Sequence, residues 1–513
     1  MKFQLNGMRS MAVLLASVRV VAAVGLIVPL LFAASVTAWL LACALAILLA
    51  GSVVRWAFLL LIDESHFIAS TPGLRVAVVT SFVPGAESLP MLERTLAGMQ
   101  KLCYPHDTWL LDEGDDDAAI ELCARLGVRH FSRKAKAEYQ TEQGQYQRGT
   151  KHGNYNAWLS ETGFANYDVL AAIDPDHVPG SNFLTETLGQ LSDPRIAYVQ
   201  SPQEYYNQPA SLIARGCSEE SRDFYWISQR AFHRFGSPSV IGAHGVHRMK
   251  ALQVMGGLAP HIADDLLLTL RYQMSGWRGA YVARVLARGL APVDWRTYVK
   301  QQRRWATSLF DVKFFLYPQM VQGMPFRSRV VGLLQGLTFL QDGVAALCCA
   351  TALAALLVAG VPASLASAVA SPPVLISATI LLLTGLYPHL FHGPHRNLTF
   401  HWRAGLLRLV KWPYTLLALA DVIRRRDRGY ALTAKVGRAT ADRSFLWPHV
   451  IICGLIGATW ILAMTLGSIQ HLLPHVAAVA AMLPSLFLVG SSFIPAPAAF
   501  DPVLADGHAD TEL

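Results

Sequence analysis

Asp174 and Asp176 form the carboxylate pair with the clearest potential for chemistry in this sequence. They flank one proline and follow directly after the short apolar run Val169–Ile173, which is typical of a buried strand. Two carboxylates at a strand end can hold a divalent cation, and that cation can neutralise a diphosphate leaving group. An Asp-x-Asp pair occurs by chance in a long chain, so its place at the end of a predicted strand carries more weight than the motif.

A second carboxylate pair, Asp264 and Asp265, comes before Leu266–Met274, whose apolar residues recur with helical spacing. The pair is therefore expected at a helix N-terminus. The helix dipole there favours the ionised carboxylate, which suits a base that removes a proton from a hydroxyl group. For Asp264 a purely structural role as the N-cap of the helix fits the sequence equally well.

Two further predicted strands end in polar residues. The run Arg75–Thr80 ends at Thr80, and Thr108–Leu111 is followed by Asp112 and an acidic stretch. Ligands of open α/β sheets bind at the carboxyl ends of strands, so both loops are candidate nucleotide sites. A calcium loop is the weaker alternative, because the twelfth position counted from Asp112 is Cys123, where an EF-hand has a Glu. A solvated acidic turn remains the stronger alternative.

Two cationic segments complete the candidate chemistry. Lys151 lies in a glycine-containing stretch that opens a predicted helix, where it and the backbone amides could neutralise a diphosphate, although no Walker pattern is present. Downstream, Arg304 could meet diphosphate oxygens and Trp305 offers a face on which a sugar can stack. Taken alone, a cationic helix beside a membrane more often contacts lipid headgroups.

The composition indicates that these motifs belong to a membrane protein. The chain has 513 residues, of which 53% are hydrophobic and 15% are charged, and this is too apolar for an ordinary soluble protein. Six apolar runs are long enough to span a membrane: two between about 11 and 62, then 343–361, 372–391, 448–468 and 472–494. The segments 326–342 and 402–426 mix polar and apolar residues, and we interpret them as interfacial helices or, equally, as surface connectors.

The net charge of +8 is concentrated beside the membrane segments. Between His392 and Trp447 there are eleven Lys or Arg and three Asp, whereas the connectors at 361–373 and 470–474 contain no Lys or Arg. By the positive-inside rule, the polar region between the second and third predicted spans is cytoplasmic, and so are both termini. No aromatic-interleaved basic groove is present, which argues against nucleic-acid binding.

In chain order, the motifs resemble those of processive family 2 glycosyltransferases, the group of cellulose, hyaluronan and chitin synthases. Asp112, Lys151–Asn154, Asp174–His177, Asp264–Asp265 and Gln301–Trp305 are similar to the D, DxD, TED and QxxRW series of that family. The resemblance implies an α/β catalytic domain of the GT-A fold inserted between transmembrane helices. It divides the chain into an N-terminal hairpin (1–70), a catalytic domain (71–328), interfacial and transmembrane helices (329–496) and a cytoplasmic tail (497–513).

The resemblance also implies a function. It implies an inverting, processive enzyme in a bacterial inner membrane that polymerises a β-linked polysaccharide from a nucleotide sugar such as UDP-glucose and translocates it, with accessory export subunits as further partners. Mg²⁺ or Mn²⁺ would be the cofactor. The implied roles are nucleobase or ribose contacts for Thr80 and Asp112, phosphate contact for Lys151, sugar-diphosphate and metal binding for Asp174 and Asp176, base catalysis for Asp265, and acceptor or diphosphate contacts for Gln301, Arg304 and Trp305.

Two departures from the family pattern limit these expectations. Ala263–Asp265 stands where the family has Thr-Glu-Asp, so the base is kept but its neighbours differ. The segment 241–248 takes the place of an acceptor-lining loop, and its His244 and His247 are unexpected in a cellulose synthase. We therefore expect His244 at the acceptor site and a different acceptor or product.

Two rival functions remain open. A non-processive transferase that adds one sugar to a polyprenyl phosphate or another lipid is the nearest, although the QxxRW-like motif argues against it. A transporter that has lost catalysis is the other, and the intact carboxylates argue against that one.

Overall fold

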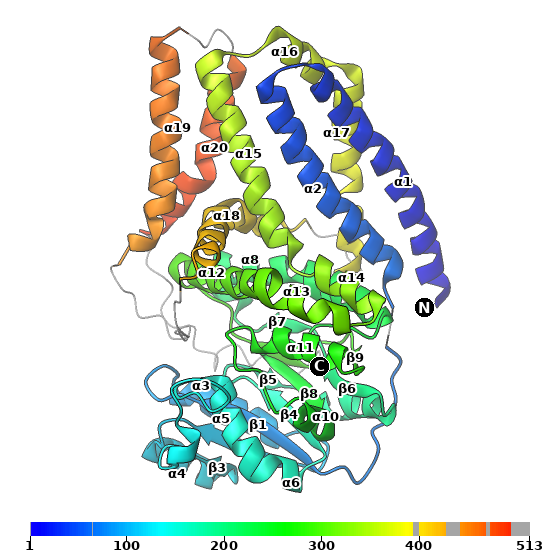
Figure 1. The fold of residues 1–513 in the computed structure, drawn as a ribbon, viewed down its shortest axis with the longest axis vertical. Helices are drawn as coiled ribbons and strands as arrows, with labels where there is room; N and C mark the ends of the chain where they lie inside the picture. The colour runs from blue at the N-terminus through cyan, green and yellow to red at the C-terminus, as the bar shows by residue number, and fades with distance from the viewer. Residues whose placement is uncertain (1, 64, 393–399, 427–441, 468–471, 494–513) are drawn as a thin grey trace.

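The computed structural model describes residues 2–63, 65–392, 400–426, 442–467 and 472–493. An α/β part forms one end of the molecule and long helices form the other, with a layer of shorter helices between them (Figure 1). The predicted tail, 497–513, lies outside the described residues.

The α/β part is built on a mixed seven-stranded sheet with the order β3-β2-β1-β4-β8-β6-β9. Its strands are β1 Val76–Phe82, β2 Asp107–Asp112, β3 Arg129–Phe131, β4 Val169–Ile173, β6 Ile196–Gln200, β8 His244–Arg248 and β9 Arg278–Tyr281. β3, β2, β1 and β4 run parallel, whereas β8 runs antiparallel to both β4 and β6. Ile173 at the end of β4 therefore pairs with His244 at the start of β8.

A second, three-stranded sheet has the order β5-β10-β7. Its strands are β5 Val178–Pro179, β7 Gln203–Tyr205 and β10 Ala287–Gly289. It extends the edge at which β4 and β6 end, because β5 follows β4 and β7 follows β6 along the chain.

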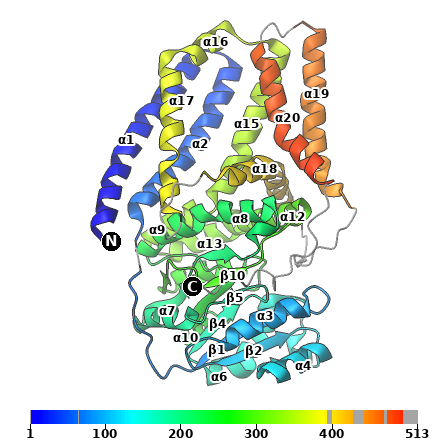
Figure 2. The same ribbon diagram turned by 180° about the vertical axis from the view of Figure 1, so that it is seen from behind.

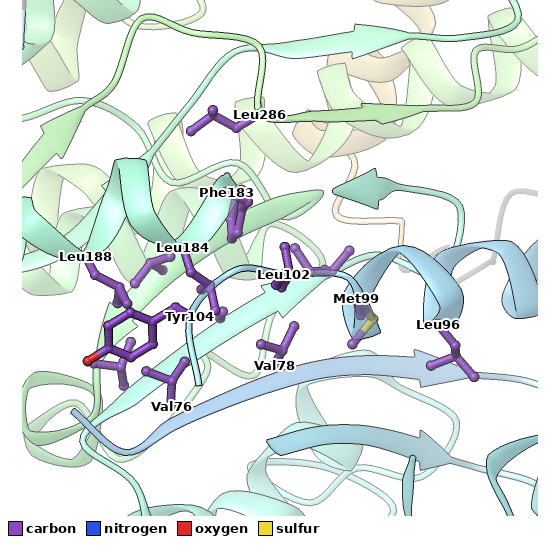
Figure 3. Packing of buried hydrophobic residues seen from close by; sticks show 14 of the residues in the cluster. Val76, Val78, Leu96, Met99, Leu102, Tyr104, Phe183, Leu184, Leu188 and Leu286 are labelled. Carbon is purple, nitrogen blue, oxygen red and sulfur yellow. The ribbon is translucent and has the colours of Figure 1, made fainter. Parts of the chain in front are cut away.

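Both faces of the large sheet are covered, which explains why β1 is a continuous apolar run. Val76 and Val78 on one face pack among buried residues of other elements, including Leu96, Met99, Leu102, Tyr104, Phe183, Leu184, Leu188 and Leu286 (Figure 3). Ala77 and Val79 on the other face pack in a separate cluster with Tyr155 and Trp158. The strand is thus fixed by alternate side chains that belong to two cores.

The helices of the α/β part and of the layer above it are mostly short. They are α3 Leu89–Gln100, α4 Asp117–Leu126, α5 Lys151–Trp158, α6 Phe164–Asn166, α7 Phe183–Thr187, α8 Leu212–Arg222, α9 Gln229–Arg234, α10 Met249–Val254, α11 Asp264–Met274, α12 Trp295–Asp311, α13 Tyr317–Met320 and α14 Phe326–Leu334. α8 and α12 both pack against α18, Trp402–Ile423, so these helices form the layer between the two ends of the molecule (Figure 2).

Six helices among the described residues are long and apolar enough to cross a membrane, as the sequence predicts. The long helical elements are α1 Lys2–Phe32, α2 Val36–Leu61, α15 Leu337–Ala359, α17 Pro372–Thr384, α19 Trp447–Thr465 and α20 Leu472–Ser491, and the short α16 Ala363–Ala370 joins α15 to α17. The first two helices come before the α/β part and the others after it. The chain is a multi-pass membrane protein whose α/β part is inserted between its spans.

The prediction of a single interfacial helix over 326–342 is wrong. α14 ends at Leu334, and Gly336 takes a left-handed conformation (φ 75°) that favours glycine because it lacks a Cβ. Residues 337–342 are instead the first turns of α15, so Gln341 and Asp342 lie on a spanning helix. In the other predicted segment, 402–426, residues 402–423 do form one helix, α18, in the layer beneath the spans (Figure 1).

Candidate active site

A cavity of about 1910 Å³ lies between the α/β part and the long helices. Its wall brings together eight of the predicted site residues: Lys151, Asp174, Asp176, Asp264, Asp265, Gln301, Arg304 and Trp305. The same cavity is lined on its other side by residues of α2 and α15, including Leu48, Gly51 and Leu340. It therefore runs without interruption from the strand ends to the membrane helices.

Lys151 and Asp174 form an ion pair at the floor of the cavity. α5 begins at Lys151 because the Thr150 hydroxyl caps the helix by accepting from the Gly153 N–H at 3.1 Å. Lys151 Nζ donates to Asp174 and to the Gly242 carbonyl, 2.6 Å away. Burial alone would lower the pKa of Lys151, but Asp174 raises it above the usual range, so the ammonium stays charged.

Asp176 and His177 continue the same loop and are almost fully buried. His177 Nδ1 lies 2.9 Å from Asp176 Oδ1, and its Nε2 lies 3.0 Å from Nε2 of Gln203. The ligand atoms of Asp174, Asp176 and His177 lie within 4.8 Å of one another, a set of oxygen and nitrogen donors that fits a divalent cation such as Mn²⁺. His177, which directly follows Asp176 in the sequence, is thus a further candidate metal ligand.

Asp264 and Asp265 are held in different ways. Asp264 is the first helical residue of α11 and Ala263 is its N-cap, so the capping role considered for Asp264 is wrong. Asp265 accepts two backbone N–H groups, that of Gly242 at 3.1 Å and its own neighbour Leu266 at 2.7 Å. Asp264 accepts one, that of Asp265 at 3.0 Å.

The two carboxyl groups also differ in how readily they ionise. Burial, together with the charge of Asp265, raises the pKa of Asp264 to about 7. Burial also raises the pKa of Asp265, but the N–H groups of Leu266 and Gly242 and the charge of Lys151 oppose that rise. Hydrogen bonds to a carboxylate favour its ionised form, so Asp265 is the group of the pair that ionises more readily.

Gln301, Arg304 and Trp305 line the roof of the cavity from α12. The helix begins after Asp294, whose side chain accepts from the Thr297 N–H at 2.8 Å. Trp305 is 39% exposed and lines the cavity. Arg303, on the same helix, instead pairs with Asp421 of α18 at 2.7 Å and fixes α12 to the layer beneath the spans.

Three predicted site residues lie outside the cavity wall. Asp112 is the last residue of β2, but β1 continues to Phe82, so the strand end predicted at Thr80 is wrong; both residues are fully buried. Asp112 accepts from the Gly114 and Asp116 N–H groups, while Thr80 Oγ1 has no hydrogen-bond partner among the described residues. The Thr80 hydroxyl is thus the polar group of this pair that the described contacts leave unexplained.

His244 is the third of these residues, and the loop predicted for 241–248 is wrong. Residues 239–243 line the cavity, but His244–Arg248 is strand β8. His244 is buried, with Nε2 2.9 Å from Ser201 Oγ and its ring 5.7 Å from that of His177. His244, His247 and Arg248 are polar and Gly245 has no side chain, so the segment lacks the apolar run that would have predicted a strand.

The sequence did not reveal the buried arginine that shapes the loop before Lys151. Arg133 is fully buried and bonds Glu113 with two nitrogens, at 2.7 and 2.9 Å. It also donates to the carbonyl groups of Tyr139, Tyr146 and Gln147. Glu113 in turn accepts from the Gly149 N–H at 2.8 Å, so this cluster positions the start of α5.

Three ion pairs at the membrane side of the cavity were also missed: Arg55 with Asp223, Asp342 with Arg408, and Glu220 with Lys411. All six residues line the cavity. Each pair joins residues far apart in the chain, and the first is separated by 168 positions, so no local pattern reveals it.

Comparison with solved structures bears out the GT-A fold. The chain is similar to a mannosyltransferase from Pyrobaculum calidifontis solved in complex with GDP-Man and Mn²⁺, with a TM-score of 0.50 and 20% sequence identity. The match covers 76% of this chain and all of that one. At this identity the likeness concerns the fold alone.

Sequence comparison identifies the class. Residues 169–419 match the family model "Glycosyl transferase family group 2". The chain is 26% identical over 262 residues to cellulose synthase 1 catalytic subunit [UDP-forming] of Komagataeibacter xylinus, and 25% identical over 376 residues to the cellulose synthase catalytic subunit [UDP-forming] of Pseudomonas fluorescens. The matches cover 49% and 70% of this chain, but only 33% and 47% of those relatives.

These findings define an integral membrane glycosyltransferase with a GT-A catalytic fold. Residues 169–419, about half of the chain, match the family 2 glycosyltransferase model, and the chain is similar to bacterial cellulose synthases.

Proposed function

We propose that this enzyme polymerises a β-linked polysaccharide from a nucleotide sugar and passes the product along its cavity toward the membrane. The observation that carries the proposal is the continuity of that cavity, which joins Asp174 and Asp265 to Leu48 of α2 and Leu340 of α15. A transferase that added a single sugar to a soluble acceptor would need only the end with the carboxylates.

The residue roles that we propose follow from charge and position. Asp265 takes the proton of the acceptor hydroxyl while that oxygen attacks the anomeric carbon and the bond to the diphosphate breaks, which inverts the configuration. Gln301 and Arg304 hold the diphosphate, and Trp305 stacks on the acceptor sugar. Thr80 and Asp112 contact the nucleoside. His244, the first residue of β8 directly after the cavity residues 239–243, acts on the acceptor side.

Asp174 and Asp176, with His177 beside them, are proposed to hold Mg²⁺ or Mn²⁺. The donor set fits such an ion, and the cavity end also holds Asp264 and Asp265, so an anionic diphosphate would otherwise be repelled. A bound divalent ion supplies charge neutralisation for the leaving diphosphate. Lys151 is paired with Asp174 in the structure. With a metal ion bound to Asp174, the Lys151 ammonium would be available to contact the phosphates.

The proposal extends to location and domains. We propose an inner-membrane enzyme with the catalytic unit 71–328 in the cytoplasm, the hairpin 1–70 and the helices 329–496 in or on the membrane, and an accessory export subunit beyond it. A cysteine placed at Arg425 in a cysteine-free variant should react with a membrane-impermeant thiol reagent only after the cells are opened.

Product analysis tests the function. Purified enzyme is given labelled UDP-glucose, other UDP-sugars and Mn²⁺, and the product is sized and its linkage determined. A long polymer is the expected result. A single sugar attached to a polyprenyl phosphate or another lipid would overturn the proposal and establish the non-processive alternative.

A further inference from the structure

Three histidines converge outside the cavity, where the α17 segment meets the layer of shorter helices. His389 lies on the 3-10 turn Tyr387–Phe391, His392 follows that turn, and His401 stands directly before α18. His392 and His401 are each only 8% exposed. The ligand atoms of the three rings lie within 4.8 Å of one another.

The nitrogen contacts in this histidine cluster are poorly explained by hydrogen bonds. His401 Nδ1 lies 2.9 Å from Nδ1 of His389 and 3.1 Å from Nδ1 of His392. An imidazole nitrogen offers either one hydrogen or one lone pair, so a single Nδ1 cannot make two full hydrogen bonds at once. A cation at the centre would instead accept one lone pair from each ring.

The spacing also suits a metal ion. Zinc–nitrogen bonds of roughly 2.0–2.1 Å in a tetrahedral site separate the ligand nitrogens by about 3.4 Å. The two observed separations need to open by only a few tenths of an ångström to reach that value. The ring planes of His389 and His392 are inclined at 76°, so the rings approach the centre from different directions.

A carboxylate stands behind one of the three rings. His392 Nε2 lies 2.5 Å from Asp223 Oδ1, and Asp223 also pairs with Arg55 at 2.6 Å. Metal-binding histidines typically donate their second ring N–H to such a carboxylate, which fixes the tautomer and orients the ring. When a neutral His392 donates its Nε2–H to Asp223, the lone pair is on Nδ1, the atom that lies 3.1 Å from Nδ1 of His401.

The geometry points to a divalent transition-metal site formed by His389, His392 and His401, with Zn²⁺ favoured by the ligand set and with Asp223 orienting His392. The ion joins the end of the fourth span to the start of α18. Asp223 and Arg55 line the cavity, so the same ion also fixes an ion pair of the cavity wall. This site is separate from the Asp174–Asp176 site and differs from it in ligand chemistry.

The first test uses the unaltered chain, purified in detergent through an affinity tag without histidine. After chelation, Co²⁺ is added and the absorption spectrum is recorded. Three imidazoles and a water should give the strong visible bands of four-coordinate Co²⁺, and Zn²⁺ should displace them. Weak bands typical of six-coordinate Co²⁺ alone would overturn the proposal.

The second test compares variants by bound Zn²⁺ after dialysis. His401→Asn and His392→Asn should each lose the ion, whereas Asp176→Asn and the control His106→Asn should retain it. His106 is a suitable control because its ring nitrogens lie near the carbonyl oxygens of Tyr104 and Met99. Equal Zn²⁺ content in His401→Asn and the unaltered chain, or loss only in Asp176→Asn, would contradict the site.

Asp223→Asn separates metal binding from folding. It removes no ligand, so it should weaken Zn²⁺ affinity by about 10- to 100-fold while the Co²⁺ bands keep their shape. If the histidine variants fail to fold, the spectrum of the unaltered chain and the affinity of Asp223→Asn decide the matter. Unchanged affinity in Asp223→Asn, together with absent Co²⁺ bands, would rule the site out.

Discussion

The two ends of the cavity differ in how their charges are balanced. At the end next to the sheet, the carboxyl groups of Asp174, Asp176, Asp264 and Asp265 line the wall together with the cations Lys151, Arg94 and Arg304. At the membrane end, the acidic groups Asp223, Asp342 and Glu220 are each paired with Arg or Lys at 2.5–2.7 Å. A cluster of buried carboxyl groups can bind a cation, whereas a wall of paired charges and apolar residues suits a neutral ligand.

We therefore propose that the two ends receive different molecules. A metal ion and a nucleoside diphosphate would bind at the end next to the sheet. An uncharged glycan would pass the membrane end without breaking its ion pairs. Four predictions test this assignment of ligands to the two ends of the cavity, from the largest expected effect to the smallest.

Asp265→Asn should reduce sugar transfer by about 10²- to 10⁴-fold, because it removes the proposed proton acceptor. Binding of UDP should change little, since Asn keeps the size of the side chain. Transfer rate and UDP affinity are measured side by side.

Asp264→Asn is the matched control, because it alters the adjacent carboxylate of the same helix. It should be the milder change. Elongation by Asp265→Asn together with inactivity of Asp264→Asn would reverse the assignment of the base.

Asp176→Asn should lower metal-dependent turnover by about 100-fold or more. The reason is that even outer-shell partners of a metal typically contribute 10- to 100-fold, and Asp176 is a proposed ligand. Turnover is measured against Mn²⁺ concentration. Asp193→Asn, which alters a surface carboxylate paired with Arg195, should behave like the unaltered enzyme. Undiminished turnover of Asp176→Asn in the presence of a chelator would remove the metal from the sheet end.

The sequence predicted the sheet end of the cavity better than the membrane end, and the reason is locality. β4 matches its predicted range, 169–173, because a short apolar run ends sharply at Asp174. Lys151, Asp174 and Asp265 each sit at the start or end of an element, where capping and strand-end rules apply to neighbouring residues. Those rules need no knowledge of distant parts of the chain.

The features that the sequence missed depend on long-range contacts. Arg133 is a surface-type residue by composition, and its burial follows only from its bonds to Glu113 and to a loop that closes over it. The break between α14 and α15 depends on the left-handed Gly336, which sequence periodicity treats as one more small residue. The His389, His392 and His401 cluster likewise forms only when the turn after α17 packs beside α18.

Thr338→Trp should shorten the product severalfold while the first transfer to a short acceptor stays within about twofold. Thr338 lines the cavity on the first turn of α15, so a large ring there should obstruct a growing chain without removing any of the carboxyl groups. Product length and initial rate are measured separately. Leu347→Trp, on the same helix at a residue that is exposed and not part of the cavity wall, is the control. Equal product lengths in the two variants would mean that the glycan leaves by another route.

The smallest expected effect is a shift of the pH profile. Asp264 and Asp265 titrate as a pair, and burial with the neighbouring charge raises the pKa of Asp264 to about 7. Asp265 ionises more readily than Asp264, but the pair keeps its last proton up to about pH 7. While that proton is shared with Asp265 the base is blocked, so the transfer rate of the unaltered enzyme should rise as pH increases through about 7. In Asp264→Asn the like charge is gone and Asp265 keeps its two backbone N–H donors, so the midpoint should move to lower pH. One pKa unit corresponds to tenfold in protonation, which bounds the gain at pH 6 to about tenfold relative to each variant's own plateau. Rates normalised to that plateau are compared from pH 5 to 9 at saturating donor. If the midpoint stays in place, the rise of the rate with pH reports a group outside the pair. If the midpoint moves to higher pH, Asp264 assists the ionisation of Asp265 rather than opposing it.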